Sequence, residues 1–203
     1  MAATGNETPE AALHEGRAGE PRTSTSARRL GMRLFLASLG MLFGGALVGY
    51  LVIRLRAPEW PPQGTAALPT GLWISTALVL LLSAALVMAE RAIRAGRARG
   101  LTRFLSLALG LAIAFLGAQL SNWMQMAADS ALPQQSLAAF GFWILTVLHA
   151  VHVLLGLVPL VFVLVRAAGG RYTTAEHEGV HLLAMYWHFL AVTWMAILAV
   201  LSF

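Results

Sequence analysis

Five long apolar blocks, separated by shorter polar segments, run along the chain. A helix needs about 20 mostly apolar residues to cross the hydrocarbon core of a bilayer. The apolar residues fall in continuous blocks, without the narrow stripe of a surface helix, so they do not all face one aqueous-domain core. The pattern predicts an all-α integral membrane bundle of five transmembrane helices within residues 30–203. The expected spans are about 34–53, 71–89, 104–124, 137–165 and 180–203.

Composition agrees with this pattern. The 203 residues are 58% hydrophobic and 11% charged, with a mean hydropathy of +0.72, whereas soluble domains average about 25% charged residues. Residues 1–29 differ, because they are rich in Ala, Gly, Glu, Thr and Ser and lack an apolar run. Such a segment cannot bury enough apolar surface to fold, so a disordered cytoplasmic tail is expected.

The arginines set the expected orientation. All 14 basic residues are Arg, and Arg54 and Arg56 alone lie in the connections on one side of the predicted membrane. Loops rich in Lys and Arg stay in the cytoplasm. The N-terminus is therefore predicted to be cytoplasmic and the C-terminus periplasmic, in a bacterial inner (plasma) membrane. The net charge of +5 points to anionic lipid headgroups, and no contact with nucleic acid is expected.

Polar side chains inside the last three spans are the candidate site residues. Residues three, four or seven apart share one face of a helix, so His149 and His152 should face one way, as should His181 and His188. His149 and His188 both lie near the expected bilayer middle, which makes them candidate neighbours. The full set of candidates is Gln119, Asn122, His149, His152, His181, Tyr186, Trp187 and His188.

These residues allow two interpretations. Several imidazoles could bind a haem or a metal, but no carboxylate within the spans supports them as an outer shell. The alternative is hydrogen bonding between helices or to a lipid, which contributes about 0.6 to 2 kcal/mol per bond in membrane bundles. The residues favour interhelical or lipid contacts. No catalytic, cofactor-binding or metal-ligating residue is expected, and Cys is absent from the chain.

Three stretches carry a resemblance to a known family. They are "LGMRLFLASLGMLFGG" (30–45), "FWILTVLHAVHVLLGL" (142–157) and "AMYWHFLAVTW" (184–194). The chain resembles the subunit III family of haem-copper oxidases, in a short five-span form. That family carries H-x-x-H-V and then Gly on one span, and Y-W-H-F and then Trp on the last. The matching residues here are His149, His152, Val153, Gly156, Tyr186, Trp187, His188, Phe189 and Trp194.

The resemblance implies a non-catalytic subunit of a respiratory terminal oxidase, which reduces oxygen to water and translocates protons. Its expected partners are oxidase subunit I, subunit II and membrane lipids. Haem and copper are expected in the partner subunits, and a phospholipid is expected to bind this chain. The resemblance also implies acidic residues at four positions, where this chain has Leu39, Asn122, His181 and Ala191. Proton-handling roles tied to those acids are therefore not expected here.

Other functions fit part of the pattern. A subunit-III-like accessory protein of nitric oxide reductase would share the fold and lack several acids, and a quinol oxidase subunit III would share the motifs. An autonomous transporter or channel is disfavoured, because the span interiors carry almost no formal charge with which to bind and release an ion.

Overall fold

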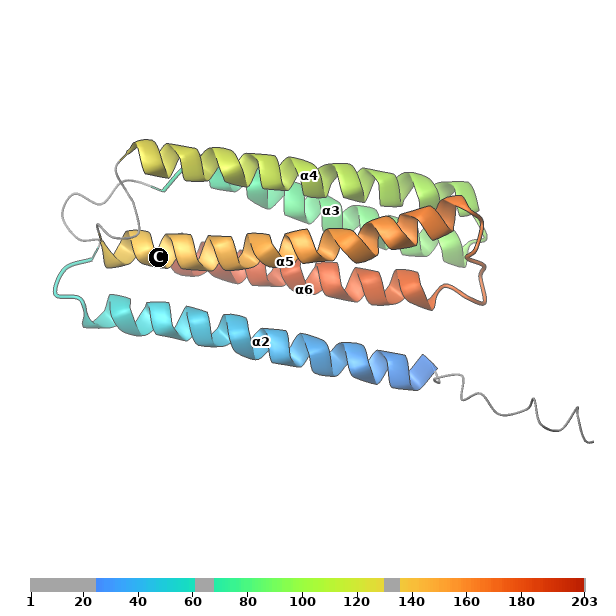
Figure 1. Ribbon diagram of the computed structural model, residues 1–203, viewed down its shortest axis with the longest axis horizontal. Helices are drawn as coiled ribbons and strands as arrows, with labels where there is room; N and C mark the ends of the chain where they lie inside the picture. Colours follow the sequence, from blue (N-terminus) through green and yellow to red (C-terminus); the bar gives the residue numbers. More distant parts are fainter. Residues whose placement is uncertain (1–24, 61–67, 130–135, 203) are drawn as a thin grey trace, which may run out of the picture.

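In the computed structural model of the chain, residues 25–60, 68–129 and 136–202 are described. They form five helices: α2 (Thr25–Arg56), α3 (Gly71–Arg94), α4 (Ala98–Ala128), α5 (Leu137–Ala168) and α6 (Glu178–Ser202). Figure 1 shows them running alongside one another in one elongated bundle. All five are long and apolar enough to cross a membrane. The predicted all-helical membrane bundle is confirmed.

The helices extend beyond the predicted spans, because polar helical turns continue past the apolar blocks. The difference is largest for α2, which begins at Thr25, nine residues before the predicted first span. Residues 25–29, which were predicted to belong to the disordered tail, are therefore helical. The rest of that predicted tail, residues 1–24, lies outside the described residues.

Two tight connections at the same end of the bundle are built alike. Gly96 follows α3 with φ 70° and Gly170 follows α5 with φ 66°, a left-handed backbone that glycine adopts without a steric cost. In each case the next amide reaches back five residues, from Arg97 to the Ala92 carbonyl (2.8 Å) and from Arg171 to the Arg166 carbonyl (3.0 Å). This is the Schellman helix end, and it reverses the chain within a few residues.

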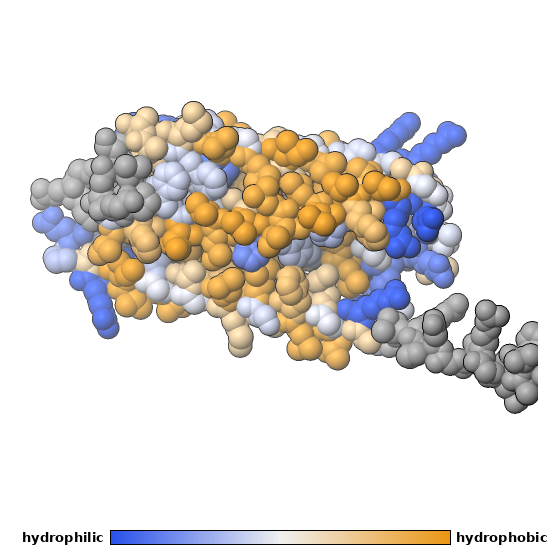
Figure 2. Space-filling view, viewed as in Figure 1, coloured by the Kyte–Doolittle hydropathy of each residue, from blue (hydrophilic) through white to orange (hydrophobic). Residues whose placement is uncertain are grey.

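The core lies where α3, α4, α5 and α6 meet, and α2 packs on α5 and α6 at one side. Burial is uneven, since 17% of the apolar window of α2 is buried, against 44% for α3 and 56% for α6. Figure 2 shows an apolar middle zone, with hydrophilic residues gathered toward the ends. Large apolar side chains such as Met41 (81% exposed) and Val158 (71% exposed) point outward, as expected for a surface solvated by lipid.

Candidate functional site

The imidazole of His149 lies at the centre of the bundle. Its side chain is fully buried, and its ring centroid lies 6.2 Å from Phe43 of α2, 5.7 Å from Phe115 of α4 and 5.1 Å from Trp194 of α6. Neither ring nitrogen has a hydrogen-bond partner among the described residues. His149 of α5 therefore contacts three other helices through its ring.

His152 shares that face of α5, as its spacing predicts, and lies 5.0 Å from Phe43. Its Nδ1 is 2.7 Å from the Leu148 carbonyl of its own helix. The Tyr186 hydroxyl of α6 donates to the backbone carbonyl of His152 at 2.7 Å. The hydrogen bond that joins α5 to α6 here thus uses a backbone oxygen and a phenol, while the His152 imidazole bonds within α5.

The two histidines of α6 face α3. His188 Nδ1 lies 2.7 Å from Ser83 Oγ, and His181 Nδ1 lies 2.9 Å from the Glu90 carboxylate. Glu90 also pairs with Arg94 one turn further along α3. The predicted common face of His181 and His188 is present. His188 meets α3, whereas the ring contacts of His149 run to α2, α4 and α6, so the proximity of these two histidines stays a prediction.

A second polar group joins α3 to α4, near the ends at which α3 begins and α4 ends. Asn122 donates through Nδ2 to Ser75 Oγ at 3.2 Å and to Gln119 Oε1 at 3.4 Å. Gln119 and Asn122 are both buried. A Cβ on Gly71 would lie 2.1 Å from Asn122 Oδ1, so α3 approaches this amide closely. Sequence reasoning singled out the two amides but not Ser75, which carries no signal beyond being a serine in an apolar span.

Tryptophan side chains extend these contacts. Trp194 Nε1 donates to Thr76 Oγ1 of α3 at 3.0 Å, and Trp123 Nε1 donates to Thr146 Oγ1 of α5 at 3.0 Å. Trp187, by contrast, is buried with its Nε1 unbonded among the described residues. Each of the four inner helices is therefore linked by a side-chain hydrogen bond to another.

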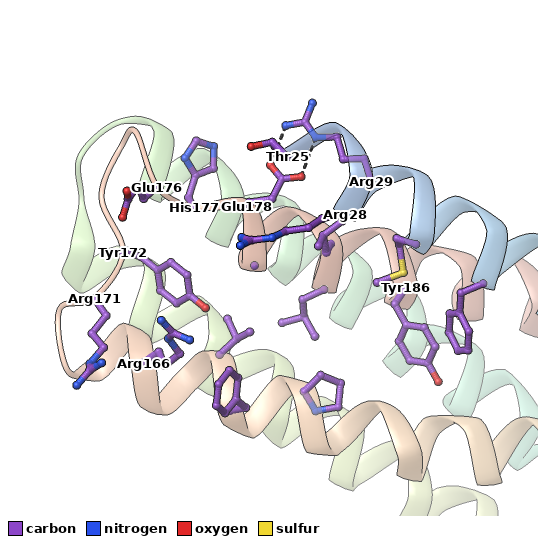
Figure 3. A pocket seen from close by; sticks show the side chains of 18 of the residues that line it. Thr25, Arg28, Arg29, Arg166, Arg171, Tyr172, Glu176, His177, Glu178 and Tyr186 are labelled. Carbon is purple, nitrogen blue, oxygen red and sulfur yellow. Dashed lines mark hydrogen bonds and ion pairs between the residues drawn. The ribbon is translucent and has the colours of Figure 1, made fainter. Parts of the chain in front are cut away.

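A pocket of about 1070 Å³ lies between α2, α5 and α6. Its deeper walls are apolar and include Phe35, Leu39, Leu155 and Val163, while four arginines line it: Arg28, Arg29, Arg166 and Arg171. Figure 3 shows Arg166, Arg171 and Tyr172 on the α5 side, opposite the α2 and α6 side. Sequence reasoning used these arginines only for orientation and missed the pocket, which forms because α2 packs beside α5 and α6, more than 80 residues further along the chain.

Tyr172, in the connection between α5 and α6, is a titratable group of this pocket that lies outside the helices. Burial raises the pKa of its phenol, and the positive charge of Arg166 offsets part of that rise. A phenol held neutral at neutral pH can donate a hydrogen bond without carrying charge. The mouth of the pocket thus combines cationic guanidinium groups with a neutral donor.

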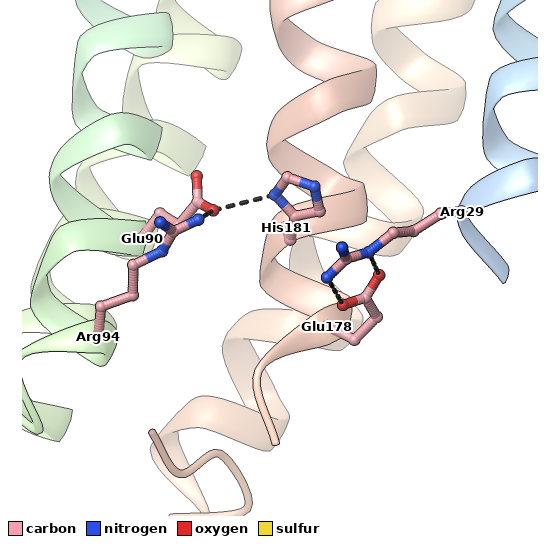
Figure 4. A network of polar contacts seen from close by, with 5 residues as sticks. All are labelled: Arg29, Glu90, Arg94, Glu178 and His181. Carbon is pink, nitrogen blue, oxygen red and sulfur yellow. Dashed lines mark hydrogen bonds and ion pairs between the residues drawn. The ribbon is translucent and has the colours of Figure 1, made fainter. Parts of the chain in front are cut away.

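An ion pair and a histidine–carboxylate contact flank the start of α6 (Figure 4). Arg29 of α2 binds the Glu178 carboxylate through Nε (2.7 Å) and a terminal nitrogen (2.8 Å). On the other side, His181 contacts Glu90 of α3. Glu90, just past the predicted limit of the second span, lies against α6 through this contact. In the sequence, Glu90 follows Ser83 by seven residues, a spacing that places both on one face of α3.

The described residues contain no group of three or more His, Asp or Glu side chains arranged to hold a metal ion. The described residues form a helical membrane protein whose mainly apolar interior holds a few polar side chains, with a pocket lined by arginines at one side. By the length and composition of its helices, it is a multi-pass membrane protein.

Comparison with known proteins identifies the family. Residues 14–203 match the family model described as cytochrome c oxidase subunit III. The chain is 29% identical over 178 residues to cytochrome c oxidase subunit 3 of Thermostichus vulcanus, with 86% of each chain covered. It is 32% identical over 173 residues to the subunit 3 of a Synechocystis species, covering 84% of this chain and 72% of the relative. The chain belongs to the cytochrome c oxidase subunit III family.

The predicted resemblance is therefore confirmed, and the protein is a subunit III of a haem-copper oxidase. The relatives carry the cytochrome c oxidase name, including a probable subunit 3 of Nocardia farcinica that is 28% identical over 180 residues. They do not favour a nitric oxide reductase or quinol oxidase subunit. Members of this family do not themselves hold the metal centres of the oxidase.

Proposed function

We propose that this chain packs against subunit I, in a complex that also contains subunit II, and stabilises that catalytic subunit in a bacterial plasma membrane. The match to the subunit III family over residues 14–203 carries this proposal. The broad apolar surface of the bundle supports it (Figure 2), because membrane helices pack on partner helices as readily as on lipid. Haem and copper belong to the partner subunits, with the N-terminus in the cytoplasm and the C-terminus in the periplasm.

The second part of the proposal is that the pocket binds a phospholipid. Its volume of about 1070 Å³ is at the upper end of ligand pockets, which range from about 300 to 1000 Å³. Arg166 and Arg171 line it at the end where α5 stops and supply guanidinium groups for a phosphate. Leu39, Leu155 and Val163 provide an apolar wall for an acyl chain. Leu39 stands where the family resemblance implies a glutamate, so the wall is apolar at that point.

The eight candidate residues have structural roles in this proposal. His149, Tyr186 and Asn122 contact neighbouring helices, and so do His181 and His188. Gln119 accepts a hydrogen bond from Asn122 within α4. His152 and Tyr186 also line the pocket, which makes them candidate lipid contacts. Trp187 packs near Gly156 of α5. None of the eight is assigned to redox chemistry.

Co-purification tests the first part. A tagged chain extracted in mild detergent should bring with it a haem-bearing subunit, identified by mass spectrometry and by a Soret band. The His149→Ala variant should retain that band, because the haem is held by the partner. Loss of the band in a variant that still brings down an equal amount of subunit I would place the haem on this chain. Purification without any haem-copper subunit would contradict the proposed partnership.

Native mass spectrometry of the complex tests the lipid. The Arg166→Gln/Arg171→Gln variant should retain less phospholipid than the parent. Arg103→Gln is the matched control, because it removes an exposed arginine of α4 that does not line the pocket. Equal lipid retention in all three proteins would contradict binding at this pocket.

A further inference from the structure

The contacts that hold α2 differ along its length. In its second half, α2 fits closely against the bundle: a Cβ on Gly141 of α5 would lie 2.2 Å from a ring carbon of Tyr50. Arg54 donates to the Val200 carbonyl near the end of α6 at 3.1 Å. In the middle, Phe43 contacts the ring of His152 at 5.0 Å. These contacts come from side chains packed directly between helices.

The first half of α2 is held differently. Figure 1 shows α2 diverging from α5 toward the end at which α2 begins, and the pocket occupies the space between them. Phe35 stacks on Tyr186 at 6.2 Å. Beyond it, the bidentate pair between Arg29 and Glu178 joins α2 to the first turn of α6. Both residues of the pair also line the pocket.

Glu178 is well placed to bind Arg29 of α2. It lies in the first turn of α6, where the helix dipole favours a negative charge. Its side chain is 17% exposed, against 47% for Arg29. The partner helix α6 is itself fixed on its other side by His181 and Glu90 (Figure 4). The pair therefore attaches the least buried helix to the most buried one.

We propose that the Arg29–Glu178 pair is a latch that holds the first half of α2 against α6 and so sets the width of the lipid pocket. With the pair formed, the first half of α2 lies against α6 and forms one wall of the pocket. With the pair broken, the beginning of α2 moves away from α5 and α6 while its second half stays docked, and the bound phospholipid exchanges faster. The predicted change in lipid exchange rests on the proposed phospholipid, whereas the predicted movement of α2 does not.

Distance measurements on the assembled complex test the latch. The chain has no cysteine, so spin labels can be placed at will. One labelled pair, Arg33→Cys with Ala168→Cys, reports the pocket end of α2 and α5. The other, Leu55→Cys with Leu137→Cys, reports the opposite end. All four positions are exposed. Glu178→Gln should lengthen or broaden the first distance distribution and leave the second unchanged.

Two comparisons separate the latch from a general charge effect. Arg29→Gln should act like Glu178→Gln, and the double variant should be no worse than either, because the partners act as one unit. Glu176→Gln, which removes another acid lining the pocket, should have no effect. An unchanged first distance in Glu178→Gln, or an equal change in Glu176→Gln, overturns the latch.

Lipid exchange provides the second readout. Replacement of bound phospholipid by a deuterated phospholipid, followed by mass spectrometry, should be roughly two- to five-fold faster in Glu178→Gln, the range expected for a partly exposed ion pair. If Glu178→Gln lengthens the first distance but lipid exchange is unchanged, the pair does not control lipid exchange, and that part of the proposal is overturned. If the parent complex retains no phospholipid, the lipid proposal fails, and the distance measurements still decide whether the pair holds α2.

Discussion

Gly156 shows how much of this bundle depends on single side chains. A Cβ at this position would lie 2.6 Å from a ring carbon of Tyr186 and 3.2 Å from one of Trp187. Tyr186 is held in place by its hydrogen bond to the His152 carbonyl (2.7 Å). The Tyr186 ring cannot retreat without losing that bond. The glycine after H-x-x-H-V thus permits α5 and α6 to meet at this distance, as small residues do in membrane bundles.

We expect Gly156→Val to lower the free energy of unfolding by about 1–3 kcal/mol, the usual cost of overpacking a tight contact. Unfolding in SDS, followed by circular dichroism, measures the change. Gly117→Val is the control, because a Cβ there meets nothing within 4 Å. A similar loss of stability in both variants would show that the contact with Tyr186 is not the cause.

The connection between α5 and α6 folds back onto the start of the helix that follows it. Gly170 reverses the chain with its positive φ, and the following residues return Tyr172 over the start of α6, where its hydroxyl would lie 2.8 Å from a Cβ on Gly179. Burial in this position raises the pKa of the Tyr172 phenol. Docking of the loop on α6 therefore depends on the phenol being neutral.

Stability should consequently fall at alkaline pH. Because the pKa of Tyr172 is raised in the folded state, the stabilisation that its neutral phenol contributes is fully present below the ordinary tyrosine pKa of about 10. That stabilisation is lost as the pH rises through the higher pKa of the folded state. Tyr172→Phe should flatten this loss in thermal unfolding between pH 8 and 12. The difference in phenolate absorbance between parent and variant should titrate above 10. Titration at or below the ordinary value would contradict a buried Tyr172.

At the scale of the whole molecule, charge is distributed unequally between the two ends. The basic residues at one end include Arg91, Arg94, Arg97, Arg99 and Arg103 around the connection of α3 to α4. The other end carries Arg54 and Arg56, and Arg54 is engaged with the end of α6. Because arginine-rich connections are retained in the cytoplasm, this asymmetry predicts a single orientation for the whole bundle.

We therefore expect Arg97→Cys to react with a membrane-impermeant maleimide from the cytoplasmic side and Thr70→Cys from the periplasmic side. Both positions are exposed, and the cysteine-free parent serves as the blank. Labelling of inverted and right-side-out vesicles distinguishes the two sides. The opposite pattern would reverse the proposed orientation.

The sequence by itself determined the number of spans, their approximate limits and the family. The reason is that an apolar block of this length crosses a bilayer as a helix, because a helix satisfies its own backbone hydrogen bonds where no water is present. Periodicity also placed His181 with His188, and His149 with His152, on common faces. These properties are local, so they can be read from residues close together in the chain.

Only the tertiary structure decided which helix each face meets. Periodicity says that two histidines share a face, but not that His188 meets Ser83 or that His149 meets Phe115. Arg29 and Glu178 lie 149 residues apart, and His181 and Glu90 lie 91 apart. Such pairs, and the pocket that Arg29 and Glu178 line, depend on the order and rotation of the helices, which close packing of many side chains sets together.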